Sequence, residues 1–147
     1  MIKLSILFAP DSTENRKAVE EIASALDAAR FAVTVKKAAE SIISDITGAD
    51  VILFGVQKTD SSEVQEEFRE LARIFKGINL AGRTAAFFNF GQDKAASALR
   101  KSLKSSDILL ADPEISLAEK SPSRQSEIKE WVRQVLAFHQ EGRNAGK

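Results

Sequence analysis

The sequence predicts a single α/β domain in which a doubly wound, five-stranded parallel sheet lies between two layers of helices. Short apolar runs typical of buried strands alternate along the chain with segments whose apolar residues recur every three or four positions. The chain has 147 residues and no internal repeat, which is about the length of one domain. Parallel strands joined by helical crossovers form three layers, and the simplest strand order is 2-1-3-4-5.

The five predicted strands are short apolar or β-branched runs bounded by turn-forming residues. The run at residues 51–56 is almost wholly apolar, which is typical of a central strand buried on both faces. The fifth run ends before Pro113 and can resume at residues 114–117. In chain order, the predicted strands are residues 4–9, 31–35, 51–56, 84–90 and 108–111.

Helices are predicted where one apolar stripe repeats at helical spacing. The first begins at about Thr13, whereas residues 38–47 predict a loop with one turn of helix. Ser62 and Gln65 form a capping-box pair, which opens a helix that ends near Gly77.

The last third of the chain predicts two more helices. One contains the apolar positions of residues 96–103, and the other starts with Ser121 as N-cap and Pro122 at the first helical position. Residues 1–142 therefore form the predicted domain, and residues 143–147 form a polar tail.

Composition excludes several classes of function. The absence of cysteine excludes disulfides, thiol nucleophiles and zinc–thiolate sites. Lys and Arg together number 21, as do Asp and Glu, which argues against a nucleic-acid-binding surface. The apolar runs fall short of the ~20 residues of a membrane span, and the N-terminus lacks a secretion-signal pattern. We therefore expect a cytoplasmic protein with no nucleic-acid or membrane partner.

The residue types and their spacing in the sequence predict neither catalytic residues nor metal ligands. His139 is the only histidine and continues the apolar face of the last predicted helix, where a structural role is expected. We find no Ser–His–Asp set and no carboxylate or histidine cluster with metal-ligand spacing.

Ligands of doubly wound sheets bind beyond the carboxyl ends of the strands, where the strand order reverses. Three segments follow strands at this edge: residues 10–16, 57–63 and 89–93. Any binding site is therefore expected to combine them.

The first of these segments has two interpretations. The free N–H groups at the start of a helix bind anions, the hydroxyls of Ser12 and Thr13 can add hydrogen bonds, and Arg16 can pair with a phosphate. Alternatively, Asp11 caps the helix and Glu14 reaches back, so that carboxylates compete with phosphate for the same donors.

The segment from Asp11 to Arg16 resembles the phosphate loop of flavodoxins, Ser-x-Thr-Gly-Asn-Thr. Thr13 and Asn15 match that loop, whereas Asp11, Glu14 and Arg16 replace its first Ser, its Gly and its last Thr. The similarity in order and spacing extends over nearly the whole chain, and the chain has the length of short-chain flavodoxins. It is also seen at residues 48–55, Glu67-Phe68 and residues 127–132.

This resemblance implies that FMN is the cofactor. Ser12, Thr13 and Asn15 would surround its phosphate, and the segments after the third and fourth strands would contact its ring. The residues expected to bind the cofactor are Asp11, Ser12, Thr13, Glu14, Asn15, Arg16, Gln57, Lys58, Thr59, Asn89, Phe90, Gly91 and Gln92.

Flavodoxins usually carry an aromatic residue after the third strand that stacks on the flavin ring. This chain has no Tyr, and its only Trp, Trp131, lies in the last predicted helix. Strand alternation places Phe87 and Phe88 in the core, whereas Phe90 at the strand end can either stack on the ring or join the core.

The resemblance predicts an FMN-binding electron-transfer protein that acts with a redox partner protein and has no substrate of its own. The alternative is a binding or regulatory module of the same fold that has lost FMN and binds another protein. An acidic stretch near the site either steers a basic partner or complements a helix dipole. It comprises Asp60, Glu63, Glu66, Glu67 and Glu70.

Overall fold

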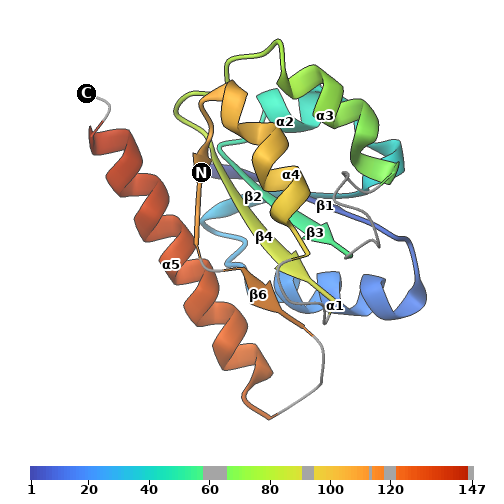
Figure 1. Ribbon diagram of the computed structural model, residues 1–147. Helices are drawn as coiled ribbons and strands as arrows, with labels where there is room; N and C mark the ends of the chain where they lie inside the picture. Colours follow the sequence, from blue (N-terminus) through green and yellow to red (C-terminus); the bar gives the residue numbers. More distant parts are fainter. Residues whose placement is uncertain (58–65, 91–94, 113, 118–121, 146–147) are drawn as a thin grey trace.

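A computed structural model of the chain describes residues 1–57, 66–90, 95–112, 114–117 and 122–145. Its strands form one parallel sheet between two layers of helices (Figure 1). The sheet order is β2-β1-β3-β4-β5, with β6 also paired to β4, which confirms the predicted fold class and order. The strands are β1 (Ile2–Phe8), β2 (Phe31–Lys37), β3 (Val51–Val56), β4 (Thr84–Asn89), β5 (Leu109–Leu110) and β6 (Ile115–Ser116).

The sheet has six strands where five were predicted, because the last one is divided. β5 pairs with the start of β4 through Leu109 and Leu110, and β6 pairs with its end through Ile115 and Ser116. Proline has no N–H to donate to a neighbouring strand, so a run that contains Pro113 does not pair continuously. Pro113 itself lies outside the described residues.

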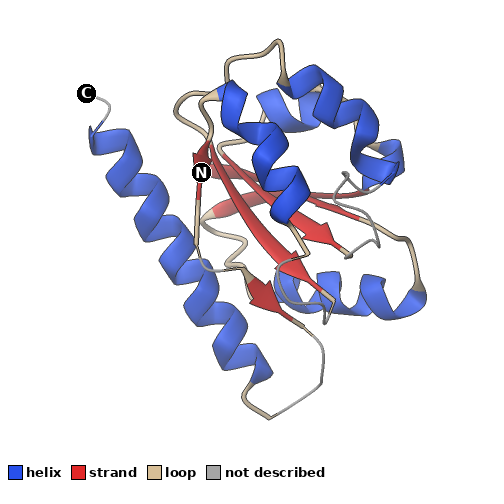
Figure 2. Ribbon diagram, viewed as in Figure 1, coloured by secondary structure: helices blue, strands red, loops and turns tan. Residues whose placement is uncertain are grey.

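The helices cover the two faces of the sheet in separate groups (Figure 2). α1 and α5 pack on the face that contains Ile6 and Leu53, and α2, α3 and α4 pack on the face that contains Leu7 and Phe54. The helices are α1 (Thr13–Ser24), α2 (Ser44–Thr47), α3 (Arg69–Phe75), α4 (Ser97–Leu103) and α5 (Arg124–Ala145). No described helix is long and apolar enough to cross a membrane.

One predicted helix start differs from the structure, and another lies outside the described residues. α3 begins at Arg69, after a 3-10 turn at Glu66–Phe68, and the predicted cap Ser62–Gln65 lies outside the described residues. α5 begins at Arg124, two residues later than predicted. There the Ser123 carbonyl accepts the first helical hydrogen bond from the Glu127 N–H, at 2.9 Å.

The C-terminal helix also runs further than expected. α5 continues to Ala145, so residues 143–145 of the predicted polar tail are helical. His139 is buried on this helix, and its Nδ1 lies 2.7 Å from Oγ1 of Thr84 on β4. The lone histidine therefore joins α5 to the sheet, as the structural interpretation expected.

Gly55 allows the aromatic side chains above the centre of the sheet to pack closely. In the strand register it lies between Phe8 on β1 and Phe88 on β4. A Cβ at Gly55 would overlap the Phe88 ring and lie 3.0 Å from Cβ of Phe8. Phe88 in turn meets Trp131 of α5 edge-on, with 6.2 Å between ring centroids. The missing side chain of Gly55 therefore makes room for the aromatic contact between β4 and α5.

We expect Gly55→Ala to lower the free energy of unfolding by about 1–3 kcal/mol, because the added methyl group overpacks this contact. Urea unfolding followed by Trp131 fluorescence measures the change. Gly77→Ala is the matched control, since a Cβ at Gly77 meets no atom within 4 Å. Equal stability of the two variants would contradict the packing role of Gly55.

Candidate functional site

The structure brings the three predicted segments together at one edge of the sheet. β1, β3 and β4 are parallel, and Phe8, Gly55 and Phe88 are aligned in neighbouring strands. The chain therefore leaves all three strands at the same edge, where α1 begins (Figure 1). Of the predicted site residues, Lys58, Thr59, Gly91 and Gln92 lie outside the described residues. Gln57 is half-buried at the end of β3.

Ser12 caps α1, so the interpretation in which Asp11 caps this helix is wrong. Ser12 has extended backbone geometry, and its Oγ accepts a hydrogen bond from the Asn15 N–H at 3.1 Å. Asn15 is buried, and its Nδ2 donates to the Pro10 carbonyl at 2.9 Å. The Ala9–Pro10 peptide bond that precedes the turn is cis. Ser12 and Asn15 thus stabilise the turn between β1 and α1 by hydrogen bonds within it.

Two N–H groups remain at the start of α1. The first turn of a helix leaves backbone donors without helical partners. Ser12 satisfies the N–H of Asn15, and its carbonyl accepts from Arg16 at 2.9 Å. Within the described part of the chain, the N–H groups of Thr13 and Glu14 have no acceptor. These two donors, at the positive end of the helix dipole, suit an anion.

The Asp11 carboxylate binds two basic side chains. Its two oxygens accept from Nε and Nη2 of Arg16 at 2.5 and 2.7 Å, and Lys37 at the end of β2 lies 3.2 Å away. Hydrogen bonding to Arg16, followed by Lys37, lowers the pKa of Asp11 to about 2. The carboxylate is therefore held toward β2 and does not occupy the N–H groups of Thr13 and Glu14.

This arrangement changes the expected role of Arg16. Its guanidinium forms a paired hydrogen bond with Asp11, so it already has an anionic partner. Lys37, which the sequence analysis missed, bridges Asp11 and Glu40, the latter at 3.3 Å. One sequence signal for Lys37 was its position just after the predicted strand at residues 31–35. That strand is expected to pair with the first strand, so its end lies beside the turn that contains Asp11.

Asn89 stabilises the end of β4 through a side-chain hydrogen bond. Its side chain is buried, and its Nδ2 donates to Oε2 of Glu114. Oε1 of the same Glu114 accepts from the Ala96 N–H at 3.2 Å. Glu114 therefore joins the residue that ends β4 to the residue that precedes α4. Sequence reasoning did not find Glu114, because its partners are 18 and 25 residues away.

Phe90 was predicted either to stack on the flavin ring or to join the core, and its position has features of both. It is half-buried, it meets Phe88 edge-on at 5.7 Å between centroids, and it packs against the core beneath α1 and α5. It also lines a cavity of about 390 Å³ beside α1, together with Asn15 and Leu117. Phe87 and Phe88 are fully buried, as predicted.

The acidic stretch is only partly described. Asp60 and Glu63 lie outside the described residues, and Glu66, Glu67 and Glu70 lie at the start of the α3 region. Glu70 pairs with Arg73 at 3.4 Å, both on the exposed side of α3. Among the described residues, no group of three or more His, Asp or Glu side chains is placed to hold a metal ion.

Comparison with known proteins relates this chain to others through its structure. No protein-family model and no curated protein matches its sequence. Solved structures match over nearly the full length of both chains. A short-chain flavodoxin associated with a non-canonical PDU bacterial microcompartment has a TM-score of 0.79 and 12% identity, covering 95% of this chain and 99% of that one. The chain has a flavodoxin-like fold.

Two further flavodoxins show the same similarity. Flavodoxin 2 from Bacillus cereus has a TM-score of 0.75 and 20% identity, covering 95% of this chain and 99% of that one. A Fusobacterium nucleatum flavodoxin bound to flavin mononucleotide has a TM-score of 0.71 and 11% identity, with coverage of 93% and 98%. At these identities the similarity establishes the flavodoxin-like fold, as the resemblance of the sequence predicted.

We expect Arg16→Gln to raise the pKa of Asp11 toward its ordinary value of 3.8, because Arg16 is the largest cause of its lowered pKa. An NMR titration of the Asp11 carboxyl carbon measures this change. Because the pKa is lower in the folded state, the stabilisation by Asp11 is present above pH 3.8 and is lost as the pH falls toward 2. Arg133→Gln, which breaks a similar exposed pair with Glu130, is the control and leaves Asp11 unchanged. An unchanged Asp11 pKa in Arg16→Gln would contradict the pairing.

We expect Glu114→Ala to lower the free energy of unfolding by about 1–3 kcal/mol, because it removes the acceptor of buried Asn89 Nδ2 and of the Ala96 N–H. Urea unfolding measures the loss. Asp112→Ala is the matched control, since the Asp112 side chain is 81% exposed and pairs only with Arg100 in the described part of the chain. The role assigned to Glu114 fails if both variants lose the same small amount.

Proposed function

We propose that this protein binds FMN at the carboxyl edge of its sheet and transfers electrons to and from a redox partner protein. The observation that carries the proposal is the open start of α1, where the N–H groups of Thr13 and Glu14 have no acceptor among the described residues. Asp11, which the sequence offered as a cap for these donors, is held by Arg16 and Lys37 instead. The flavodoxin-like fold, and the FMN bound by one of the similar structures, support the choice of ligand.

The hydrogen-bond donors at the start of α1 match the acceptor oxygens of a phosphate group. The N–H groups of Thr13 and Glu14 and the hydroxyl of exposed Thr13 are the donors that a phosphate monoester accepts from. Ser12 and Asn15 hold the turn by hydrogen bonds within it, so they position the donors. In the proposal, Asp11 and Arg16 contribute by neutralising each other beside the anion.

The ring of FMN would lie over the ends of β3 and β4. Gln57, Lys58 and Thr59 follow β3, and residues 89–92 follow β4. Of these residues, Asn89 holds the end of β4 to Glu114, and Phe90 is the only aromatic one in the sequence of these two segments. The flavin itself supplies the redox chemistry when it is bound, while the protein binds and orients it and limits its contact with water.

Glu14 is the residue that opposes the proposal. Its exposed carboxylate lies in the first turn of α1, beside the two open N–H groups. It favours the second candidate function, a binding or regulatory module of the same fold that does not bind FMN and acts through another protein. The same titration distinguishes the two functions.

We expect purified protein to quench the fluorescence of added FMN, with a dissociation constant in the micromolar range or below. Glu14→Gln is expected to tighten binding about fivefold, because it removes a charge that repels the phosphate at roughly 1 kcal/mol in an exposed site. Glu20→Gln, which removes an exposed carboxylate further along α1, is the control for the change in net charge and leaves the affinity unchanged.

One result would overturn the proposal. If neither the wild-type protein nor Glu14→Gln binds FMN at high micromolar concentration, the protein is not an FMN carrier, and the second candidate function stands. A bound FMN that a flavin reductase can reduce, and that then reduces a haem protein, would support the electron-transfer part. A bound flavin that exchanges no electrons would contradict that part alone.

A further inference from the structure

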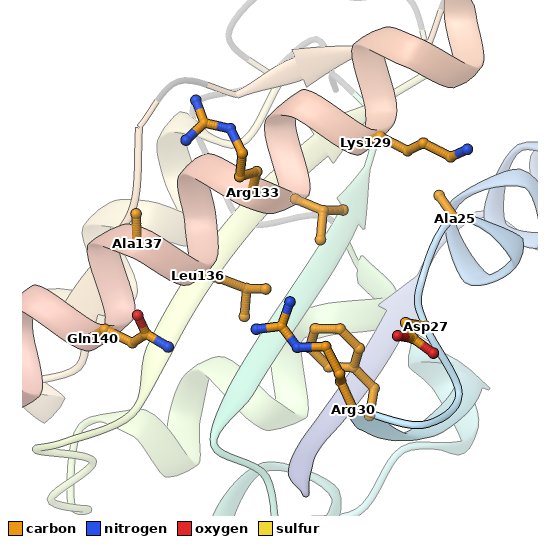
Figure 3. Close-up of a pocket in the computed structure, with 10 residues that line it drawn as sticks. Ala25, Asp27, Arg30, Lys129, Arg133, Leu136, Ala137 and Gln140 are labelled. Carbon is orange, nitrogen blue, oxygen red and sulfur yellow. The ribbon is translucent and has the colours of Figure 1, made fainter.

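A second cavity lies at the opposite end of the sheet from the candidate FMN site. It has a volume of about 310 Å³ and is formed where α1 ends, β2 begins and α5 crosses them (Figure 3). β2 runs from Phe31 at this cavity to Lys37 beside Asp11, and α1 runs in the reverse sense, from its N-cap Ser12 to its C-cap Ala25. The two sites are therefore separated by the length of these elements.

The floor of this cavity is apolar. Phe31 at the start of β2 and Val132 and Leu136 on α5 line it, and each of these side chains is at least nine-tenths buried in the core between the sheet and α5. A hollow of this size whose floor consists of aromatic and aliphatic side chains suits the apolar part of a small molecule.

The rim of the cavity is basic. Arg30, Lys129 and Arg133 line it with Gln140, and the only acidic lining residue is Asp27. The Asp27 carboxylate already has a partner two residues away, because its Oδ1 accepts a hydrogen bond from the Ala29 N–H at 2.9 Å. The cavity therefore has a local excess of positive charge on a protein whose formal net charge is zero.

The three cations differ in whether they have a partner. Arg133 forms a paired hydrogen bond with Glu130, at 2.5 and 2.9 Å, and extends away from Arg30 in Figure 3. Within the described residues, Arg30 and Lys129 form no ion pair, so both charges at this cavity are available to an anion. The guanidinium of Arg30 extends from the turn before β2 toward Leu136 on α5 (Figure 3). It also lies 5.9 Å from the centroid of the Phe31 ring.

We propose that this cavity binds a small monocarboxylate with an apolar body, with the carboxylate on Arg30 and the apolar body on Phe31, Val132 and Leu136. Arg30 offers two parallel N–H donors, which match the geometry of a carboxylate. Lys129 adds a second unpaired positive charge at the rim, and the Gln140 amide adds a neutral donor. A small ligand suits a cavity of about 310 Å³ better than a protein segment does.

The test uses octanoate as the probe and the isotopically labelled protein without flavin. We expect octanoate to shift the methyl signals of Val132 and Leu136 and the Nε–Hε signal of Arg30, with saturation at millimolar concentration or below. Octanol has the same apolar chain without the charge, and we expect it to bind at least about tenfold more weakly. The readout does not involve FMN, so it is independent of the proposed function.

Variants on the rim separate recognition from general attraction. Arg30→Gln is expected to weaken octanoate binding about tenfold or more, because it removes charge-assisted hydrogen bonds. Arg133→Gln removes the same charge from the same rim, but its guanidinium is already bound by Glu130, so we expect less than about a threefold change.

The proposal is wrong if octanol binds as tightly as octanoate, or if Arg30→Gln and Arg133→Gln have equal effects. It is also wrong if octanoate shifts the N–H signals of Thr13 and Glu14 and leaves Val132 and Leu136 unchanged. In that case the carboxylate binds at the start of α1. Absence of any shift at high millimolar octanoate would likewise overturn it.

Discussion

Burial of a parallel sheet on both faces is the constraint on which the rest of this structure depends. Parallel strands must be joined by crossovers that cover the sheet, so every strand from β1 to β4 ends at the same edge. The turn before α1, the end of β3 and the end of β4 are therefore neighbours, although they are far apart in the sequence. Close packing at the centre, where the Phe88 ring covers Gly55, keeps these strand ends in register.

The character of that edge is decided by the partners of one carboxylate. Asp11 and Glu14 together would make the start of α1 unfavourable for an anion. The pairing of Asp11 with Arg16 and Lys37 cancels its charge and directs it toward β2. Because this pairing uses both oxygens of the Asp11 carboxylate, Glu14 is the one unpaired carboxylate among the described residues of the first turn of α1.

The opposite end of the sheet has a different electrostatic character. There Arg30 and Lys129 lie over apolar side chains without an acidic partner in the described part of the chain, whereas Arg16 and Lys37 beside the start of α1 are paired. The net charge of zero therefore conceals an uneven distribution. The cavity forms because α5, which continues to Ala145, crosses the end of α1 and the start of β2 (Figure 3).

Local patterns in the sequence were sufficient for most of the fold. Apolar runs located the first four strands, helical spacing located α1 and α5, and Phe87 and Phe88 are buried as predicted. The start of α5 was predicted two residues too early, and the last strand, whose interruption at Pro113 was expected, was counted as one strand where the structure has β5 and β6. Both depend on which backbone groups find partners, as when Ser123 replaces Ser121 at the start of α5.

The sequence by itself determined the order of the strands, the edge of the sheet where the three candidate segments meet and the flavodoxin-like resemblance. These follow from hydrophobic periodicity and from the direction of the strands, which are local properties or topological rules. Only the tertiary structure decided the partners of Asp11 and Asn89 and placed Arg30 beside α5. Lys37 lies 26 positions beyond Asp11 in the numbering and Glu114 lies 25 residues beyond Asn89. Such pairs form only when strands far apart in the sequence lie side by side, because charge pairing depends on distance in space.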